Sequence, residues 1–441
     1  MPNILLILTD QQSATMMSCA GNRHFQTPSM DSIAQRGQRF EKAYCTFPVC
    51  LASRFSLMTG RMPSEIGLHP PISISPPVSS KVIRNTIGNL FNHAGYDTYL
   101  AGKHHFPNAS AEDCGFSVLT TDQRNECADV CAKFLTQRDR KKPFFLVASF
   151  INPHDICYMA IRSALPKINS SQDEAYKLVE NGKVEISTLD RALEKPPDIS
   201  EDLFWHKLCP ELPINHQPLN DEPSMVKKIL CQRQFRSIVR ENWTERDWRL
   251  HRWAYGRLTE MVDEQIGRVL RALRQSGLEQ DTVIIFTSDH GDHDGARKME
   301  HKTFPYEEAT RIPLIISFSG ETKEGSIDKT NLVSNGLDLL PTLCDYADID
   351  VPNELNGRSL RPLTLAQNDS KWRRDILIES TNSRAIQDSR HKYILYNQGS
   401  NREQFFDLRT DPNEMVNLIN EPEYIAPFEA LKSKLIKSME V

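Results

Sequence analysis

The sequence predicts an α/β protein: a large, mostly parallel sheet sandwiched by helices, with a small C-terminal antiparallel sheet and helix. Two observations support this fold class. Ile4–Leu8 and Phe144–Phe150 are continuous apolar runs without alternation, which is typical of parallel strands covered on both faces. Beyond Asp350, short apolar runs precede a final helical segment near 425–439, which predicts a separate small sheet with one covering helix.

The expected elements of the main sheet alternate between strands and helices. Thr27 caps the first helix with Pro28 at its first position, and Thr244 with Asp247 forms a capping-box variant. The predicted strands are 4–8, 39–44, 96–101, 144–150, 283–286 and 312–318, and the helices are 27–36, 86–94, 124–137, 244–275 and 338–347. In the C-terminal part, we expect strands at 376–379, 393–396 and 404–408.

We expect the main domain over residues 1–348 and the small α+β subdomain over 349–441. Between about 156 and 231 the pattern weakens into Pro-rich, mixed-charge sequence, which we interpret as an insertion or lid. The helix that follows carries four arginines, interpreted as a solvated face rather than as contacts to an anionic substrate: Arg246, Arg249, Arg252 and Arg257.

Composition excludes some classes of function. With 441 residues, of which 39% are hydrophobic, the chain can bury a large core. A net charge of -5 and a pI near 6.3 argue against a nucleic-acid partner, but leave small or polymeric anionic substrates open. Ten irregularly spaced cysteines predict free thiols.

Targeting signals are also absent from the sequence as given. No stretch approaches the ~20 apolar residues that a membrane span needs, so we expect no membrane partner. The chain starts Met-Pro-Asn and enters an apolar run directly, without a basic region or cleavage site. This predicts a cytoplasmic protein, or a periplasmic one if the sequence has been trimmed. The oligomeric state is left open.

Polar side chains follow four predicted strands at the point where each strand ends. They are Asp10, Lys103 with His105, His154, and Asp289 with His290. In a doubly wound sheet these ends share one edge, and ligands bind in the crevice outside it. Any one cluster alone would suggest a structural role, but four at strand ends favour a common site.

The chemistry of these residues suits the binding of a divalent cation together with an oxyanion. Oxygens and an imidazole from two remote strands could hold a divalent cation: Asp10, Gln11, Asp289 and His290. Cations and titratable imidazoles would lie beside it: Lys103, His105, His154 and Lys302. A metal with fixed cations suits a tetrahedral oxyanion such as sulfate or phosphate.

The stretch Cys50–Gly60 looks like the start of a helix, with Ser53 able to cap it. A cysteine at the positive end of a helix favours a thiolate or a bound oxyanion, and Arg54 adds positive charge. Taken alone, a buried structural cysteine is the commoner role.

This stretch resembles the signature of the type I, formylglycine-dependent sulfatases of the alkaline phosphatase superfamily. That signature is C-x-P-S-R followed three residues later by L-T-G, and here Ala52 replaces the proline and Met58 the leucine. Further motifs extend the resemblance over nearly the whole chain: Thr-Asp-Gln-Gln, Gly-Lys-His-His, Asn-Pro-His-Asp, Ser-Asp-His-Gly-Asp and Phe-Asp-Leu-Arg-Thr-Asp-Pro-Asn-Glu.

The resemblance implies that a maturation enzyme oxidises Cys50 to formylglycine. It also implies one divalent cation, with the ligands Asp10, Gln11, the modified Cys50, Asp289 and His290. Calcium is expected, with manganese or zinc as alternatives, because Gln11 and His290 stand where many relatives carry Asp and Asn.

The mechanism implied by the resemblance begins with attack of the formylglycine hydrate on sulfur, with a sulfate oxygen polarised by the cation. Arg54 and Lys103 would hold the hydrate, while His154 and Lys302 stabilise or protonate the departing alcohol oxygen. His105 would then take a proton from the hydrate, releasing sulfate from a covalent ester. Proximity to motifs suggests four substrate contacts: His69, His104, Asp155 and Arg297.

Three functions remain as alternatives. The first is a sulfatase acting on a sulfated carbohydrate or another sulfate ester. The second is a phosphonate monoester or phosphodiester hydrolase, since the Gln11 and His290 pairing is similar to that of this sister group. The third is a binding protein with an unmodified Cys50. The full set of polar positions favours the first.

Overall fold

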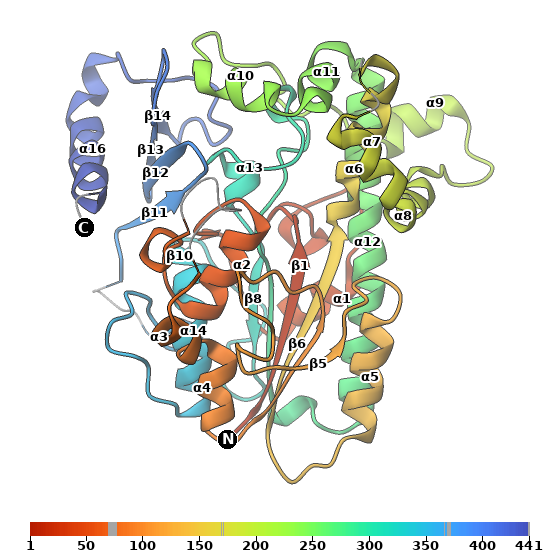
Figure 1. Ribbon diagram of the computed structural model, residues 1–441, viewed down its shortest axis with the longest axis vertical. Coiled ribbons are helices and arrows are strands. Elements are labelled where there is room, and N and C mark those ends of the chain that lie inside the picture. Colours follow the sequence, from red (N-terminus) through yellow and green to blue (C-terminus); the bar gives the residue numbers. More distant parts are fainter. Residues whose placement is uncertain (69–76, 169, 171, 366, 368–371, 440–441) are drawn as a thin grey trace.

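The computed structural model describes residues 1–441 except 69–76, 169, 171, 366, 368–371 and 440–441 (Figure 1). At its centre is an eight-stranded sheet of order β5-β4-β6-β1-β7-β8-β2-β9. In that order, the strands are Ser117–Thr120, Asp97–Gly102, Phe144–Pro153, Asn3–Asp10, Thr282–Ser288, Leu314–Ser317, Gln38–Phe40 and Ser326–Asp328. The strands from β5 to β7 are parallel, whereas β8 runs antiparallel to β7 and β2. The predicted large, mostly parallel sheet is confirmed.

Strand β1 shows why the apolar runs lack alternation: all its residues are buried. Ile4, Leu6 and Leu8 pack into the core on one face of the sheet, and Leu5 and Ile7 into the core on the other. Each such side chain contributes on the order of 2 kcal/mol. The first face is covered by α2 (Cys50–Thr59), α4 (Ile87–His93) and α14 (Asn335–Ala347), and the second by α1 (Pro28–Gln35), α5 (Cys127–Gln137) and α12 (Glu245–Gln275) (Figure 1).

The register of the central strands brings their C-terminal ends together. Thr9 pairs with Ser288 across β1 and β7, and Asp10 pairs with Pro153 across β1 and β6. The segments that follow β1, β6 and β7 therefore leave the sheet at one edge. This is the edge at which the sequence predicts a site.

The C-terminal part forms a four-stranded antiparallel sheet. Its strands are β11 (Asp375–Glu379), β12 (Ser383–Asp388), β13 (His391–Tyr396) and β14 (Glu403–Asp407), and α16 (Ile425–Met439) covers one face. The other face packs against Met299, Phe304 and Tyr306 of the main domain. The predicted small sheet and helix are confirmed, although β12 was not predicted because its sequence is largely polar. The exact domain boundary remains a prediction.

One predicted strand is wrong. Residues 39–44 do not form a single strand, because the chain turns at Glu41 and Lys42. β2 joins the main sheet, whereas β3 (Ala43–Tyr44) pairs with β10 (Val333–Ser334) in a separate ribbon. Short helices complete the connections: α3 (Ser80–Arg84), α13 (Glu307–Thr310) and α15 (Arg361–Thr364).

The segment without a clear sequence pattern, about 156–231, and the residues that follow it up to 242 contain several short helices joined by loops. These helices are α6 (Cys157–Ala164), α7 (Glu174–Asn181), α8 (Lys183–Leu193), α9 (Glu201–Leu203), α10 (Ser224–Cys231) and α11 (Gln234–Asn242). Together these residues, 157–242, are called the helical insertion below. It packs against the first half of α12 around small apolar cores of its own (Figure 1). Its role as a lid remains a prediction.

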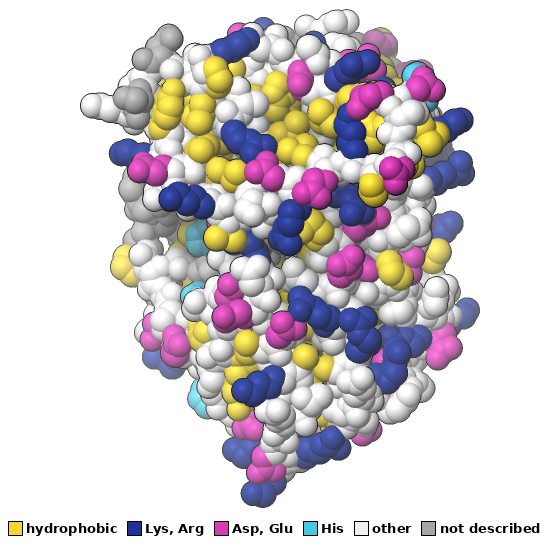
Figure 2. All heavy atoms as spheres, turned by 90° about the vertical axis from the view of Figure 1, so that its right-hand side faces the viewer, with side chains coloured by type: hydrophobic (Ala, Val, Ile, Leu, Met, Phe, Trp, Pro, Cys, Tyr) yellow, Lys and Arg dark blue, Asp and Glu magenta, His cyan; other side chains and the backbone are white. Residues whose placement is uncertain are grey.

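The arginines at the start of α12 do more than form a solvated face. Arg249 donates hydrogen bonds to the carbonyl oxygens of Pro210 (3.0 Å) and Cys209 (3.1 Å), and Arg252 pairs with Asp294 (3.0 Å). These contacts tie the helical insertion and a later loop to the long helix. On the molecular face that includes α12, acidic and basic side chains are interspersed (Figure 2).

All ten cysteines are free thiols, as predicted. Among the residues that the structure describes, no helix combines the length and apolarity that crossing a bilayer requires.

Candidate active site

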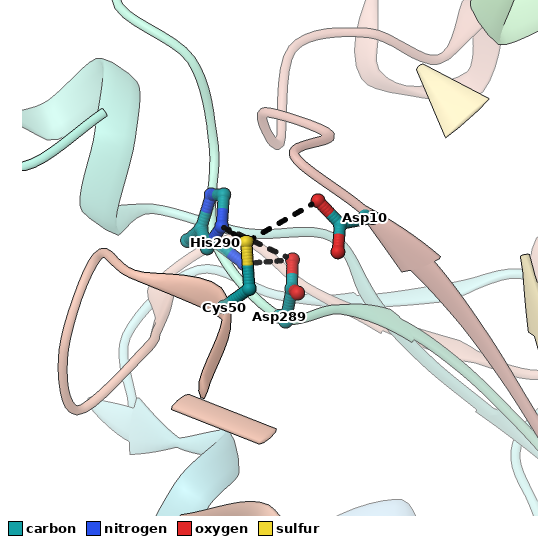
Figure 3. A group of neighbouring side chains, drawn as sticks. All are labelled: Asp10, Cys50, Asp289 and His290. Atoms are coloured by element: carbon teal, nitrogen blue, oxygen red, sulfur yellow. Dashed lines mark hydrogen bonds and ion pairs between the residues drawn. The ribbon is translucent and has the colours of Figure 1, made fainter. Parts of the chain in front are cut away.

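Four buried side chains converge where β1 and β7 end. Asp10 is the last residue of β1, Asp289 and His290 follow β7, and Cys50 is the first residue of α2 (Figure 3). One ligand atom from each lies within 4.8 Å of the others, and Cys50 Sγ is 3.2 Å from His290 Nε2. The predicted meeting of Asp10, Asp289 and His290 is therefore found, and Cys50 joins them.

The local sequence places Cys50 at a helix N-terminus. Val49 is the extended N-cap residue, and Gly60 ends α2 in a left-handed conformation with φ 66°. The expectation that Ser53 caps this helix is wrong, because the helix has already begun at Cys50. The Ser53 hydroxyl instead donates to the Asp289 carbonyl oxygen at 2.5 Å, which ties the helix to the end of β7. Cys50 is therefore the first residue of a helix, where the N–H groups of the first turn have no intrahelical partner.

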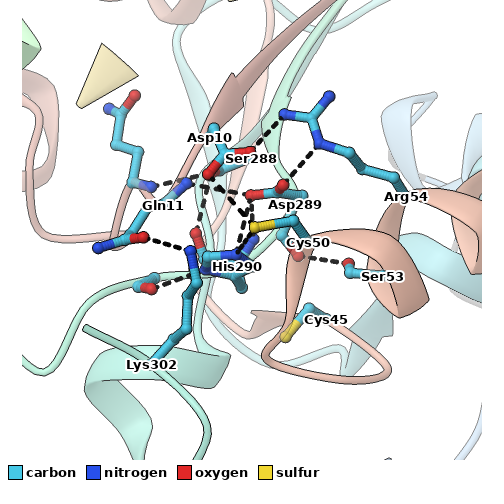
Figure 4. Close-up of polar contacts among 12 residues, drawn as sticks. Asp10, Gln11, Cys45, Cys50, Ser53, Arg54, Ser288, Asp289, His290 and Lys302 are labelled. Carbon is cyan, nitrogen blue, oxygen red and sulfur yellow. Dashed lines mark hydrogen bonds and ion pairs between the residues drawn. The ribbon is translucent and has the colours of Figure 1, made fainter. Parts of the chain in front are cut away.

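Arg54 holds the two carboxylates in place. Its Nε donates to Asp289 Oδ2 at 2.7 Å and its Nη2 to Asp10 Oδ2 at 2.9 Å (Figure 4). Nη1 donates to Ser149 Oγ at 2.8 Å, and the side chain is almost fully buried. Since the protein itself occupies these donors, Arg54 orients the carboxylates from behind the site.

Two lysines add positive charge. Lys103 Nζ lies 2.6 Å from Asp10 Oδ2, and Lys302 Nζ donates to Gln11 Oε1 at 2.5 Å. Burial opposes ionisation of Asp10, yet Lys103 and Arg54 hold the pKa of its carboxyl well below the usual range. Asp10 therefore stays ionised as a negative centre among cations.

The surroundings of Cys50 also favour its charged form. Burial and the Asp10 carboxylate raise the pKa of the thiol, but Lys103, Lys302 and His290 together hold it well below its usual range. A thiolate is both the nucleophilic and the metal-binding form of cysteine. By contrast, burial raises the pKa of Cys157, which contacts Gln11, to about 12. The site thus distinguishes residue 50 from its neighbouring thiol.

The donor set fits a divalent cation. His290 donates from Nδ1 to the Gly291 carbonyl oxygen at 2.9 Å, which directs Nε2 towards Cys50 and the carboxylates. The outer oxygens of both Asp10 and Asp289 accept from Arg54, which leaves Asp10 Oδ1 facing Cys50 Sγ at 3.7 Å. Oriented carboxylates with an imidazole fixed by its second nitrogen are typical of metal sites.

Gln11 lies beside this group but its amide is engaged elsewhere. Its Oε1 accepts from Lys302, and its Nε2 donates to Asp292 Oδ2 at 2.6 Å. Its backbone N–H, at a positive φ of 68°, donates to Asp289 Oδ1 at 3.0 Å. Gln11 thus connects Lys302 to the site, and its role as a metal ligand remains a prediction.

The predicted histidines differ in their surroundings. His154 begins the short helix η4 (His154–Ile156) after β6, and its buried Nδ1 has no hydrogen-bond partner among the described residues. Burial and Lys302 lower its pKa, so the imidazole is neutral near pH 7. His104 also has a buried Nδ1 without such a partner, whereas His105 is exposed. A role of His105 as a base remains a prediction.

Two of the four suggested substrate residues form hydrogen bonds with other residues of the protein. Asp155 is buried and accepts two hydrogen bonds from Arg124, at 2.6 and 2.8 Å. Arg297 is buried against Glu308 and the carbonyl oxygens of Asn413 and Glu414. Their charges are therefore paired within the protein.

His69, the third suggested substrate residue, lies outside the described residues.

Residues that the sequence reasoning missed support this site from outside. Ser149, near the end of β6, binds Arg54 and donates to the Lys103 carbonyl oxygen at 2.6 Å. Arg236, on α11, donates to the carbonyl oxygens of Glu300 (3.1 Å) and Lys302 (3.3 Å). The position of Ser149 at a strand end was a usable signal, but nothing in the sequence connects Arg236 to a loop 66 residues later.

The loop that carries Lys302 is strained. His301 and Thr303, on either side of the lysine, have positive φ values of 62° and 116°. Such conformations are unfavourable for side chains other than glycine and persist only when surrounding contacts hold them. The bonds from Arg236 supply such contacts from the helical insertion.

Comparisons with known proteins agree with this geometry. A family model described as "Sulfatase" matches residues 2–349, and one described as "N-sulphoglucosamine sulphohydrolase, C-terminal" matches residues 295–440. The chain is 29% identical to an arylsulfatase of Clostridium perfringens, covering 100% of this chain and 94% of the relative. It is also 29% identical to a Delta 4,5-hexuronate-2-O-sulfatase of Bacteroides thetaiotaomicron, covering 96% and 85%.

Solved structures share the fold. That of a 2-O GAG sulfatase superposes with a TM-score of 0.80 at 26% identity, covering 100% of this chain and 92% of the other. A phosphonate monoester hydrolase of Agrobacterium radiobacter has a TM-score of 0.73 at 19% identity, covering 99% and 95%. At this low identity, the second similarity concerns the fold alone.

Proposed function

We propose that this chain, which belongs to the sulfatase family, removes sulfate from a sulfated saccharide by means of an aldehyde formed from Cys50. Membership of the family makes it a sulfuric ester hydrolase. The observation that carries the proposal is the burial of Cys50 at a helix N-terminus, within 4.8 Å of two carboxylates and an imidazole. A structural cysteine would not need this environment.

Cys50 is proposed to be oxidised to formylglycine by a maturation enzyme, and the hydrate of that aldehyde carries the attacking oxygen. Asp10, Asp289 and His290, with residue 50, would hold a divalent cation. When bound, the cation supplies Lewis acidity towards a sulfate oxygen and favours ionisation of the hydrate. Calcium is the cation we expect, with manganese and zinc as the alternatives.

The protein's own side chains then act on the charge that develops. Arg54 keeps both carboxylates in position, the ammonium group of Lys103 stabilises negative charge on the sulfate oxygens, and that of Lys302 stabilises the departing alcohol oxygen. His154, neutral near pH 7, donates a hydrogen bond to the departing alcohol oxygen. His105 is proposed to take the proton that returns residue 50 to its resting state.

The substrate class rests on the relatives. Those with 26–29% identity include sulfatases named for hexuronate and N-acetylglucosamine substrates. We therefore propose a sulfated mono- or oligosaccharide as the substrate.

The first test uses a peptide that contains its own reference. Trypsin should release residues 43–54, which carry both Cys45 and Cys50. After alkylation, an unmodified peptide carries two labels, whereas the matured peptide carries one label and an aldehyde. We expect the single-label form after coexpression with a formylglycine-generating enzyme, together with aryl-sulfate turnover. Two labels and no turnover would contradict the proposal, and Cys45→Ala serves as the control for label assignment.

The same preparation distinguishes the remaining alternatives. Paired aryl-sulfate and aryl-phosphonate substrates should show preference for the sulfate, and preference for the phosphonate would favour the sister activity. A chelator should abolish turnover, and restoring calcium, manganese or zinc one at a time identifies the cation. Turnover that survives complete removal of the cation would refute the proposed metal site.

A further inference from the structure

A second cleft opens between the main domain and the C-terminal sheet. One side is formed by Phe47, which lies in the loop before Cys50, and by Leu68, which follows η2 (Ser64–Ile66). The other side is formed by the turns β11–β12 and β13–β14, and the cleft has a volume of about 310 Å³. We call it the hairpin cleft.

Two hydrogen bonds tie the hairpin cleft to the candidate active site. The Glu379 N–H donates to the Thr46 carbonyl oxygen at 2.8 Å, and the Ser380 hydroxyl donates to the Thr303 carbonyl oxygen. Thr46 belongs to the loop that leads into Cys50, and Thr303 follows Lys302. The β11–β12 turn therefore bridges the two loops that carry reactive side chains.

The distance from the reacting residue is short. Phe47 precedes Cys50 by three residues, so their Cα atoms are at most about 11 Å apart. This separation is within the span of a disaccharide. The near wall of the hairpin cleft therefore lies no more than about one disaccharide length from residue 50.

The far wall of the cleft is positively charged. Arg384 and Arg402 line it together with Glu379 and the amides of Asn382 and Asn397, so cations outnumber the single carboxylate among the lining residues. Arg384 Nη2 is 3.9 Å from its nearest carboxylate oxygen, Oε1 of Glu379, and Arg402 is exposed. Guanidinium groups bind carboxylate or sulfate through two parallel hydrogen bonds. At this distance from Glu379, the guanidinium N–H groups of Arg384 can form two parallel hydrogen bonds to a bound anion.

We infer that the hairpin cleft binds an anionic group, a carboxylate or a second sulfate, on a sugar next to the one that bears the scissile sulfate. This inference rests on the proposed function, because it assigns specificity within the same reaction. The two arginines supply the positive charge that such a group requires.

The test compares Arg384→Ala, Arg402→Ala and the double variant with the wild-type enzyme, using aryl-sulfate turnover as the readout. Competitors are a sulfated disaccharide with a uronate carboxylate, its carboxyl-reduced form, and a form with an additional sulfate. We expect the arginine variants to raise the inhibition constants of the anionic competitors roughly 10- to 100-fold. The aryl-sulfate kcat/KM should stay within about twofold, since the aryl group does not reach the arginines. Comparing the carboxyl-reduced and additionally sulfated forms identifies which anion is bound.

Matched controls make the result specific. Arg409 is exposed in the turn that follows β14 and lies outside the hairpin cleft, so Arg409→Ala should change no inhibition constant. The lysine variants Arg384→Lys and Arg402→Lys should recover part of the affinity. Unchanged inhibition constants in the double variant, or equal inhibition by the uronate, carboxyl-reduced and additionally sulfated disaccharides, would overturn the inference.

Failure of the proposed function would be visible separately. A matured protein without aryl-sulfate turnover refutes the sulfatase mechanism and says nothing about the arginines. In that case calorimetric titration of the same disaccharides into Cys50→Ala decides the inference. Affinity for the anionic forms that the double arginine variant loses supports it, and affinity that the variant keeps overturns it.

Discussion

Two buried clusters of charge in this protein are built from the same kinds of side chain. The edge cluster comprises Asp10, Arg54, Lys103, Asp289 and His290 around Cys50, and the inner cluster comprises Arg297, Glu307, Lys392 and Glu414. In the inner cluster Lys392 Nζ lies 2.7 Å from Glu307 and 2.8 Å from Glu414. The edge cluster instead leaves Asp10 Oδ1 and the Cys50 thiol facing one another at 3.7 Å.

The difference shows what separates a structural ion pair from a reactive one. In the inner cluster both carboxylates share the Lys392 ammonium group, so their charges are paired within the protein. A buried group that is not fully paired lowers the stability of the fold. Such groups are found at functional sites, where an unpaired atom can bind a ligand or react. Variants in each cluster test this contrast, because those in the edge cluster should affect turnover and those in the inner cluster should affect stability.

The largest effect is expected at residue 50 of the edge cluster. Cys50→Ala removes the proposed source of the attacking group, so aryl-sulfate turnover should fall by roughly four orders of magnitude or more. Thermal stability should remain close to that of the wild type, because only a thiol in an incompletely paired cluster is lost. Cys231→Ala, at an exposed thiol, is the control. Retained turnover in Cys50→Ala would place the nucleophile elsewhere.

Removing the cation of the inner cluster should have the opposite outcome. Lys392→Met leaves Glu307 and Glu414 buried without their shared partner, which should lower the free energy of unfolding by about 3–5 kcal/mol. Denaturation in urea measures this loss, and turnover per folded molecule should be unchanged. Lys323→Met, at an exposed position, is the matched control. If Lys392→Met lost turnover without losing stability, the contrast between the clusters would be false.

A smaller effect is expected where the helical insertion supports the edge cluster. Arg236→Met removes the hydrogen bonds to the strained loop around Lys302, so we expect kcat to fall roughly tenfold. If Lys302 stabilises the departing oxygen, the loss should grow as the leaving group becomes more basic, across a series of aryl sulfates. Arg233→Met, at an exposed neighbour on the same insertion, is the control. A loss independent of the leaving group would limit Arg236 to general stabilisation.

The smallest effect concerns a pair at the edge of the C-terminal sheet. Hydrogen bonds from Arg390 hold the pKa of Asp407 well below its usual value in the folded state. The pair therefore contributes stability that is present above about pH 4 and is lost as the pH falls. Melting temperatures measured between pH 6 and pH 3 should fall less steeply for Arg390→Gln than for the wild type. Parallel curves would show that this pair is not linked to the acid response.

The sequence predicted the parts of this fold that depend on unbroken apolar runs. The strands at Ile4–Leu8 and Phe144–Phe150 are buried on both faces, so their pattern needs no partner to be recognised. β12 was missed because its residues, from Ser383 to Asp388, pair at the centre of a small sheet while remaining largely polar. The short helices of 157–242 were missed because each buries only a few side chains.

The candidate active site also has a part that the sequence predicted and a part that it did not. Asp10, Asp289 and His290 were predicted to meet because topology alone brings strand ends to one edge. The use of Arg54 against the two carboxylates depends on side-chain geometry, which the spacing of residues does not contain. The part played by Arg236 depends on how the insertion folds back, a contact between segments with no pattern in common.

The depth of residue 50 has a consequence for the biosynthesis of the protein. In the folded chain Cys50 is 6% exposed and sits inside the first turn of a helix. An enzyme that modifies the Cys50 thiol must reach it, and the buried position at the start of α2 gives little access. On the proposed mechanism, oxidation therefore competes in time with folding, and a chain that folds first remains a stable but inactive molecule. The active fraction of a preparation is then fixed during synthesis, before purification begins.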